Sequence, residues 1–147
     1  MSKAHEALTD HLRQILADTY VLAVKTHAAH WNVTGAQFFS LHAAFGTQYE
    51  ALFTAADDLA ERLRALGGKA PTGLRALGKA SKVEDIDGSD GLKLAKSLYE
   101  DHAALSAALK KGIAVAESDD DGATADLLTG RLEEHDKTAW MLKATIA

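Results

Sequence analysis

The sequence predicts an all-α protein built as a bundle of four long helices. Apolar residues recur at three- and four-residue spacings along four stretches of the chain, which is typical of amphipathic helices. Pro71 is the only proline, and Ala and Leu are abundant, so little in the sequence opposes helix formation. The 147 residues are enough for one core but not comfortably for two. We therefore expect a single domain spanning residues 1–147.

Local signals place the first two helices. Ser2 is a suitable N-cap for a first helix that runs to about Trp31, because its hydroxyl can accept a bond from a free backbone N–H. The Asn-Val-Thr-Gly segment (32–35) supplies a turn. A second helix is predicted to begin near Ser40, or a few residues earlier, and to end at Gly67–Gly68.

A long connection precedes the last two helices, and residues 74–81 could form a short helix within it. Ser89 or Asp90 is the expected N-cap of a third long helix that ends at about Glu117. The last helix is expected over about 123–145. Four long helices with one long central connection indicate a ferritin-like four-helix bundle.

Composition excludes several kinds of function. The chain has no cysteine, which rules out disulfides, thiolate metal sites and cysteine nucleophiles. Its net charge is −5, and no run of basic residues offsets this, so the surface should repel a nucleic-acid backbone. The N-terminus lacks an apolar export segment and no membrane span is expected, so we expect a cytoplasmic protein.

The stretch from Thr26 to Arg62 predicts a metal site. No Asp, Glu, Lys or Arg occurs between Lys25 and Glu50, so we expect this part to be buried, although its imidazoles and amides make it too polar for a membrane span. The stretch places three histidines before three carboxylates, namely His27, His30, His42, Asp57, Asp58 and Glu61. Imidazole and carboxylate ligands together suit iron, zinc or manganese.

Helix geometry predicts that this site is shared between two subunits. The Glu-x-x-His pairs of di-iron bundles are absent from the chain. His42 and Asp57 are 15 residues apart on one helix, or roughly 22 Å at the helical rise, so they cannot bind the same ion within one chain. A second copy of the helix, antiparallel across a two-fold axis, would bring His42 beside the carboxylates of the partner.

Five motifs are spread along the chain: H-W-N-V-T-G (30–35), F-x-x-L-H-x-x-F (38–45), D-x-x-x-E-R (57–62), A-T-A-D-L-L (123–128) and K-T-A-W-M-L (137–142). With these motifs the chain resembles the Dps family, the small ferritins that form hollow twelve-subunit shells. The resemblance covers nearly the whole chain. It implies a homododecamer whose metal centres combine His30 and His42 of one subunit with the residues matching Asp57 and Glu61 of its two-fold partner.

The resemblance also implies an activity. Such centres are ferroxidases: they oxidise Fe(II), preferably with hydrogen peroxide, and the ferric mineral collects in the shell. This would store iron and protect against oxidative stress. Iron is thus the implied metal, and haem is not expected, because Met1 and Met141 are the only methionines.

Two features depart from the family pattern. The family usually has an acidic residue one turn after the second histidine, where this chain has Gly46. We therefore expect a weakly held second iron, or Glu50 as a substitute ligand, and predict that Gly46→Glu tightens the second position. Family members that bind DNA usually carry a basic tail, whereas only Lys3 precedes the first helix here, which argues against DNA binding.

Two alternative functions stay open: a nucleoid-associated protein that binds and protects DNA with little ferroxidase activity, and a purely structural bundle. The remaining histidines are interpreted as structural, namely His5, His11, His102 and His135. His27 either orients a ligand or packs in an interface, and Asp58 is either solvated or paired with Arg62 four residues on. The resemblance places the start of the last helix, with Asp126 as first candidate, at an entry pore for Fe(II).

Overall fold

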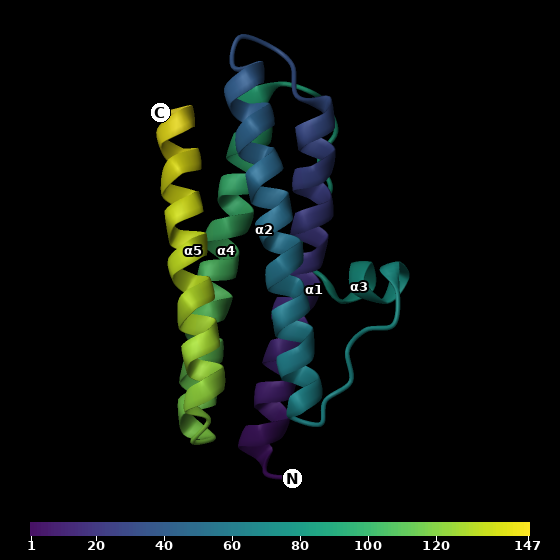
Figure 1. Cartoon of the computed structure of the whole chain (residues 1–147), viewed down its shortest axis with the longest axis vertical. Helices are drawn as coiled ribbons and strands as arrows, with labels where there is room; N and C mark the ends of the chain where they lie inside the picture. The colour runs from purple at the N-terminus through teal and green to yellow at the C-terminus, as the bar shows by residue number, and fades with distance from the viewer.

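The computed structural model describes all residues from Met1 to Ala147 and contains only helices (Figure 1). The elements are α1 (Lys3–Asn32), α2 (Phe38–Ala65), α3 (Leu74–Ala80), α4 (Gly91–Ser118) and α5 (Gly122–Ile146). Four long helices and the short one in the connection match the predicted elements, with ends within about two residues of those expected. The prediction of an all-α, ferritin-like bundle is confirmed.

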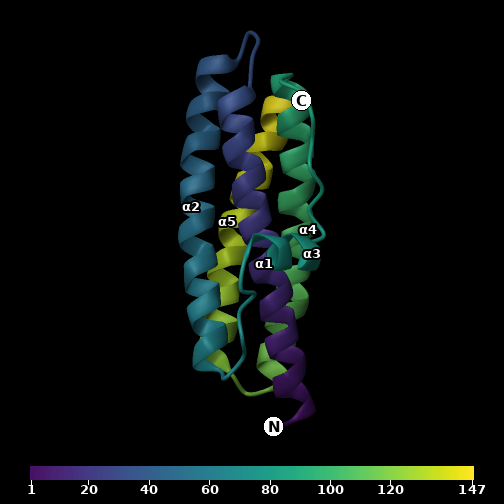
Figure 2. The same ribbon diagram turned by 90° about the vertical axis from the view of Figure 1, so that its right-hand side faces the viewer.

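The four long helices form two antiparallel hairpins, α1–α2 and α4–α5, that pack side by side (Figure 1). The connection from α2 to α4 returns along the length of the bundle and carries α3, which packs against α1 (Figure 2). At its far end, Thr34 N–H donates to the Ser89 carbonyl at 2.8 Å, which joins the α1–α2 turn to the residues before α4. None of the helices is long and apolar enough to cross a membrane.

Side-chain caps begin three of the long helices. Ser2 Oγ accepts from the His5 N–H at 3.0 Å, as predicted. Asp90 caps α4 by accepting from Lys93 N–H at 3.0 Å, and Asp121 caps α5 by accepting from Thr124 N–H at 2.9 Å. Each cap satisfies a backbone donor that has no partner within its own helix, and so sets where the helix begins.

The interior is a continuous cluster of leucine, alanine and other apolar side chains from the four long helices. Phe45 is its largest fully buried side chain. Gly91, the first residue of α4, allows a close approach, because a Cβ there would lie 2.7 Å from Leu41 Cδ1. Burial of this apolar surface is the main force that holds the two hairpins together.

Buried polar groups fasten α1 to the rest of the molecule. Asp18 accepts from Ser81 Oγ at 2.9 Å and from Lys82 N–H at 2.7 Å, which ties the end of α3 to α1. Lys25 and Asp101 form an ion pair of 2.7 Å between α1 and α4. Burial raises the pKa of Asp101, and the hydrogen bond from Lys25 opposes that shift.

Candidate metal centre

His30 and His42 lie side by side where α1 ends and α2 begins. The connection between these helices is short, so the last turn of α1 packs against the first turns of α2. The two imidazole rings stack with centroids 3.8 Å apart and planes 14° from parallel. His30 Nδ1 lies 2.6 Å from the His42 carbonyl oxygen, and His42 Nδ1 lies 2.7 Å from the His30 carbonyl oxygen.

These two hydrogen bonds determine the tautomers of both rings. A carbonyl oxygen can only accept, so each Nδ1 must carry the proton and donate it. In a neutral imidazole the other nitrogen then keeps its lone pair. Both Nε2 atoms are therefore available as metal ligands, oriented by backbone bonds of the kind that hold ligating histidines in other metal proteins. We call His30 and His42, held in this arrangement, the candidate half-site for a metal ion.

The predicted carboxylates do not reach this half-site within one chain. Asp57 and Glu61 are exposed on α2, and 15 residues of helix separate Asp57 from His42, which amounts to roughly 22 Å. No group of three or more His, Asp or Glu side chains is placed to hold a metal ion within the single chain. One chain thus brings the two histidines together and leaves the two carboxylates on another part of the same helix.

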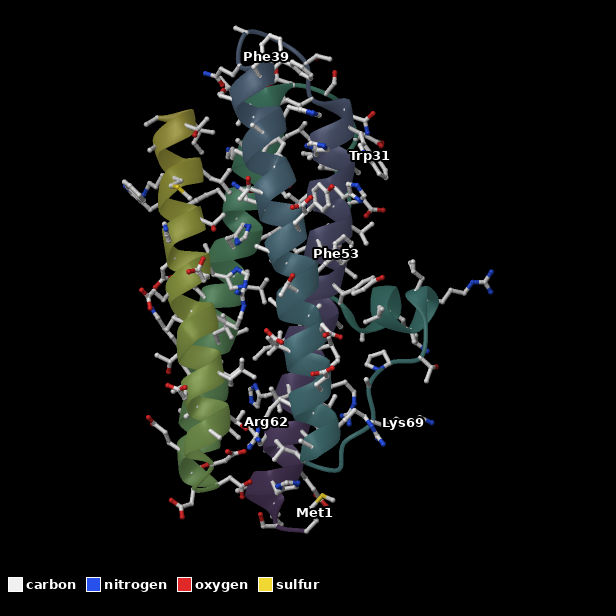
Figure 3. All side chains as sticks on the ribbon, in the orientation of Figure 1. Met1, Trp31, Phe39, Phe53, Arg62 and Lys69 are labelled. Atoms are coloured by element: carbon white, nitrogen blue, oxygen red, sulfur yellow. The ribbon has the colours of Figure 1, made fainter.

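Aromatic side chains surround the half-site. His27 stacks on Tyr49 with ring centroids 4.0 Å apart and contacts Trp31 at 4.1 Å. Trp31 is 64% exposed and Phe39 is 86% exposed, at the end of the bundle where α1 turns into α2 (Figure 3). The expectation that the charge-free stretch is buried is therefore wrong for the isolated chain. A single bundle has only one side of each helix to bury, so the other side remains uncovered.

Gly46 leaves room for the imidazole of His30. A Cβ at this position would lie 3.1 Å from His30 Cε1 and 3.2 Å from His30 Nδ1. Any larger residue would therefore press on the ring whose Nε2 is a candidate metal ligand. This changes the expectation for Gly46→Glu: the substitution would disturb the first histidine as well as add a carboxylate, so a tighter second site no longer follows.

Gly46→Ala should weaken metal binding at the half-site. The added methyl group must displace the His30 ring by a few tenths of an ångström, which strains its 2.6 Å bond to the His42 carbonyl. We expect Co(II) affinity to fall about 10-fold, as for other residues that orient metal ligands. Gly130→Ala is a matched control, because a Cβ at that helical glycine would meet nothing within 4 Å. Equal Co(II) titrations of the two variants would contradict this role for Gly46.

Arg62 pairs with a different carboxylate from the one expected. Its Nη2 donates to both carboxylate oxygens of Asp121, at 2.9 and 3.0 Å, and its Nε donates to Thr124 Oγ1 at 2.8 Å. The predicted partner Asp58 is exposed and makes no ion pair with Arg62. Of the two interpretations of Asp58, exposure to solvent is confirmed and pairing with Arg62 is wrong, because the N-cap of α5 lies within reach of the guanidinium.

His102 and His135 form a contact that the sequence did not reveal. Both are buried, and their Nδ1 atoms lie 2.8 Å apart although the residues are 33 positions apart in sequence. Each histidine lies in the apolar stripe of a long helix, α4 or α5. The presence of a histidine in each stripe could have suggested a buried pair from the sequence. Whether the two histidines meet, however, depends on how the two helices are aligned.

Comparison with known protein families and curated sequences identifies the class of protein. The family model of the ferritin-like domain matches residues 9–147. The DNA protection during starvation protein 2 of Bacillus anthracis is 37% identical over 134 residues, which cover 90% of this chain and 92% of that protein. General stress protein 20U of Bacillus subtilis is 34% identical over 140 residues, 95% of this chain and 97% of that protein.

Comparison with solved structures gives the same class of protein. The Dps protein from Bacillus brevis superposes with a TM-score of 0.96 at 32% identity, covering 100% of this chain and 99% of that one. Dps from Staphylococcus aureus gives 0.93 at 30% identity, with 97% and 96% coverage. The Dps protein of Vibrio cholerae O1, described as a member of the ferritin-like diiron-carboxylate superfamily, gives 0.93 at 28% identity, with 98% and 91% coverage. The chain belongs to the ferritin-like proteins and, within them, to the Dps family.

Proposed function

We propose that this protein is a ferroxidase that oxidises Fe(II) with hydrogen peroxide and stores the ferric product inside a shell of twelve copies. The observation that carries the proposal is the half-site itself. His30 and His42 present two unprotonated Nε2 atoms, yet the same chain offers them no carboxylate. Two histidines oriented as metal ligands, with no third ligand in the same chain, are explained if another subunit supplies the remaining ligands.

The second subunit would contribute Asp57 and Glu61. These exposed carboxylates lie one helical turn apart on α2 and so share a face. If two copies of α2 run antiparallel across a two-fold axis, each end of the pair combines two histidines with two carboxylates. Two such centres then form per dimer. Imidazole nitrogens and carboxylate oxygens together are a ligand set that suits iron.

The exposed side chains around the half-site support contact with a second copy. Trp31 and Phe39 are large, uncharged and exposed, and no charged residue lies between Lys25 and Glu50. A patch of this kind is typical of a protein–protein interface. The same contact that buries the patch would bring the carboxylates of the partner to His30 and His42.

The proposed reaction balances without releasing a radical. Each of two Fe(II) ions gives one electron, and one hydrogen peroxide accepts both as its O–O bond breaks. With two water molecules, the products are two FeOOH units and four protons. The protein holds the Fe(II) ions with neutral imidazoles and carboxylates, and ferric mineral then accumulates inside the shell. The exposed Asp126, near the start of α5, is our candidate for drawing Fe(II) to an entry pore.

The name of the Bacillus anthracis relative refers to DNA protection, and we propose that this chain protects DNA by removing the reactants that damage it. Removing Fe(II) and peroxide together prevents formation of hydroxyl radicals near the DNA. Direct binding to DNA is the less favoured alternative. The net charge of the chain is −5, so its surface should repel the negatively charged phosphate backbone.

Replacing the two histidines tests the proposed function. His30→Ala with His42→Ala should slow peroxide-dependent Fe(II) oxidation at least about 100-fold, because each centre loses both nitrogen ligands. The rate is followed by stopped-flow absorbance of the ferric product under anaerobic conditions. Asp58→Ala is the control, because Asp58 is also exposed and lies beside Asp57 but has no proposed role in metal binding. Parent-like oxidation by the double-histidine variant would refute the proposal.

A further inference from the structure

A small cavity in the middle of the bundle is lined by polar side chains that the proposed iron chemistry does not use. It has a volume of about 30 Å³ and lies between α2, α4 and α5. Gln48 of α2, His102 of α4 and Arg131 of α5 all line it. The cavity is separate from the histidine half-site between α1 and α2.

Hydrogen bonds behind the cavity determine the tautomers of the buried histidine pair. Arg131 Nη2 lies 3.2 Å from His135 Nε2, and a guanidinium can only donate, so His135 Nε2 accepts. Neutral His135 then carries its proton on Nδ1 and donates it to His102 Nδ1 at 2.8 Å. His102 therefore carries its own proton on Nε2.

Three side-chain atoms of residues that line the cavity are buried without a protein partner. They are His102 Nε2, Arg131 Nε and Gln48 Oε1. The first two are N–H donors, by the tautomer argument and by the chemistry of guanidinium, and the third is an acceptor. His102 is only 2% exposed. Leaving such groups unpaired is unfavourable, because they lose their hydrogen bonds to water without gaining others, so the fold favours a ligand that satisfies all three.

We propose that this cavity is a binding site for one internal water molecule that bridges the two helical hairpins. Its oxygen accepts from His102 Nε2–H and Arg131 Nε–H, and one of its hydrogens is donated to the Gln48 carbonyl oxygen. Three such bonds are usual for a buried water, and the cavity exceeds the roughly 10–15 Å³ that one water needs. The volume is sufficient, and the two N–H donors and the unpartnered Gln48 oxygen give the water three partners.

Other small ligands fit less well. A metal ion needs lone pairs, but His102 and Arg131 both present N–H groups. A halide ion would face the Gln48 oxygen, and Glu134, which also lines the cavity, would repel it.

The water would also join the two hairpins, because α2 packs mainly on α1 and α5 mainly on α4. It would connect α2 to the α4–α5 hairpin where direct contacts are sparse.

Crystals of the intact shell grown with bromide in place of chloride test the proposal at about 1.2 Å resolution or better, where hydrogens begin to appear. The expected result is one oxygen-sized peak within about 3.2 Å of all three protein atoms. No anomalous bromide signal should appear there. A bromide peak, a metal peak or a cavity without density would each overturn the proposal.

Gln48→Leu provides a second test. It removes the acceptor, so the water peak should disappear and the Tm should fall by about 2–6 °C. The control is Gln37→Leu, which replaces an exposed glutamine that makes no capping bond at the start of α2. A retained peak in Gln48→Leu crystals would show that Gln48 does not hold the water. Should Gln48→Leu fail to assemble, the crystals of the parent still decide the question.

Discussion

Shells reassembled from two inactive variants should recover about a quarter of the parent ferroxidase activity. One variant carries His30→Ala with His42→Ala, and the other carries Asp57→Ala with Glu61→Ala. In a mixed two-fold pair, one centre inherits both defects, while the other receives intact histidines and intact carboxylates. Random pairing makes about half of the pairs mixed, and each has one good centre of two. Activity is measured after unfolding, mixing and refolding, as the initial rate of Fe(II) oxidation.

Each variant refolded alone is the control and should stay inactive. Native mass spectrometry can verify that the mixed shells contain both chains. A site built within one chain would recover nothing, because no single chain in the mixture is whole. Mixed shells that remain inactive would therefore refute the shared site, even if the His30 and His42 variant had already shown that the histidines are needed.

Acidification should destabilise the fold through the buried pair of His102 and His135. Burial lowers the pKa of His102 to about 4, assisted by the positive charge of Arg131. Burial also lowers the pKa of His135, assisted by His102 and Arg131. The unfolded chain therefore binds more protons than the fold as the pH falls from about 6.5, so stability is full above that pH and is lost towards pH 4.

The expected loss is large because both unprotonated nitrogens of the pair, His102 Nδ1 and His135 Nε2, already accept hydrogen bonds. An added proton must go to a nitrogen that now accepts a bond, next to the guanidinium of Arg131. The negative charges nearby are Glu134 of α5 and Asp58 of α2, which interact with Arg131 but form no ion pair with it. The depressed pKa of His102 corresponds to about 3 kcal/mol, or about 6–12 °C in Tm.

Thermal unfolding at pH 7 and pH 4 measures the effect at matched protein concentration. His102→Leu with His135→Leu removes the titrating pair and should lose about 6–12 °C less than the parent between these two pH values. His11→Leu removes a half-buried histidine of α1, away from the pair, and should lose as much Tm as the parent between these pH values. If the parent and the double variant lost the same number of degrees, the acid sensitivity would have another origin.

The long helices could be predicted from the sequence because their causes are local. The apolar spacing that defines α1, α2, α4 and α5 repeats within a few residues of chain. Ser2 was recognised as a cap, and Asp90 as one of two candidates with Ser89, because a capping side chain bonds to a backbone group three residues away. The short helix α3 and the long connection followed from the glycines and the single proline that interrupt the pattern.

His30 and His42 could be proposed as ligands for a related reason. Their place in a charge-free stretch and in family motifs is visible in sequence. The helical rise alone shows that Asp57 lies too far along α2 to join His42 in one chain. Spacing along a single helix is known before the helix packs, so the need for a second subunit could be inferred without a structure.

The sequence by itself thus determined the four long helices, the cap of α1 and the histidines proposed for the half-site. Only the tertiary structure decided which side chains meet across helices. His102 meets His135, Arg62 meets Asp121 in place of Asp58, and Gly46 makes room for His30. These contacts depend on the rotation and register of one helix against another, which the packing of the whole core sets. The tertiary structure also decided that the Nε2 atoms of the half-site are free, because backbone carbonyls from two different helices determine the tautomers of His30 and His42.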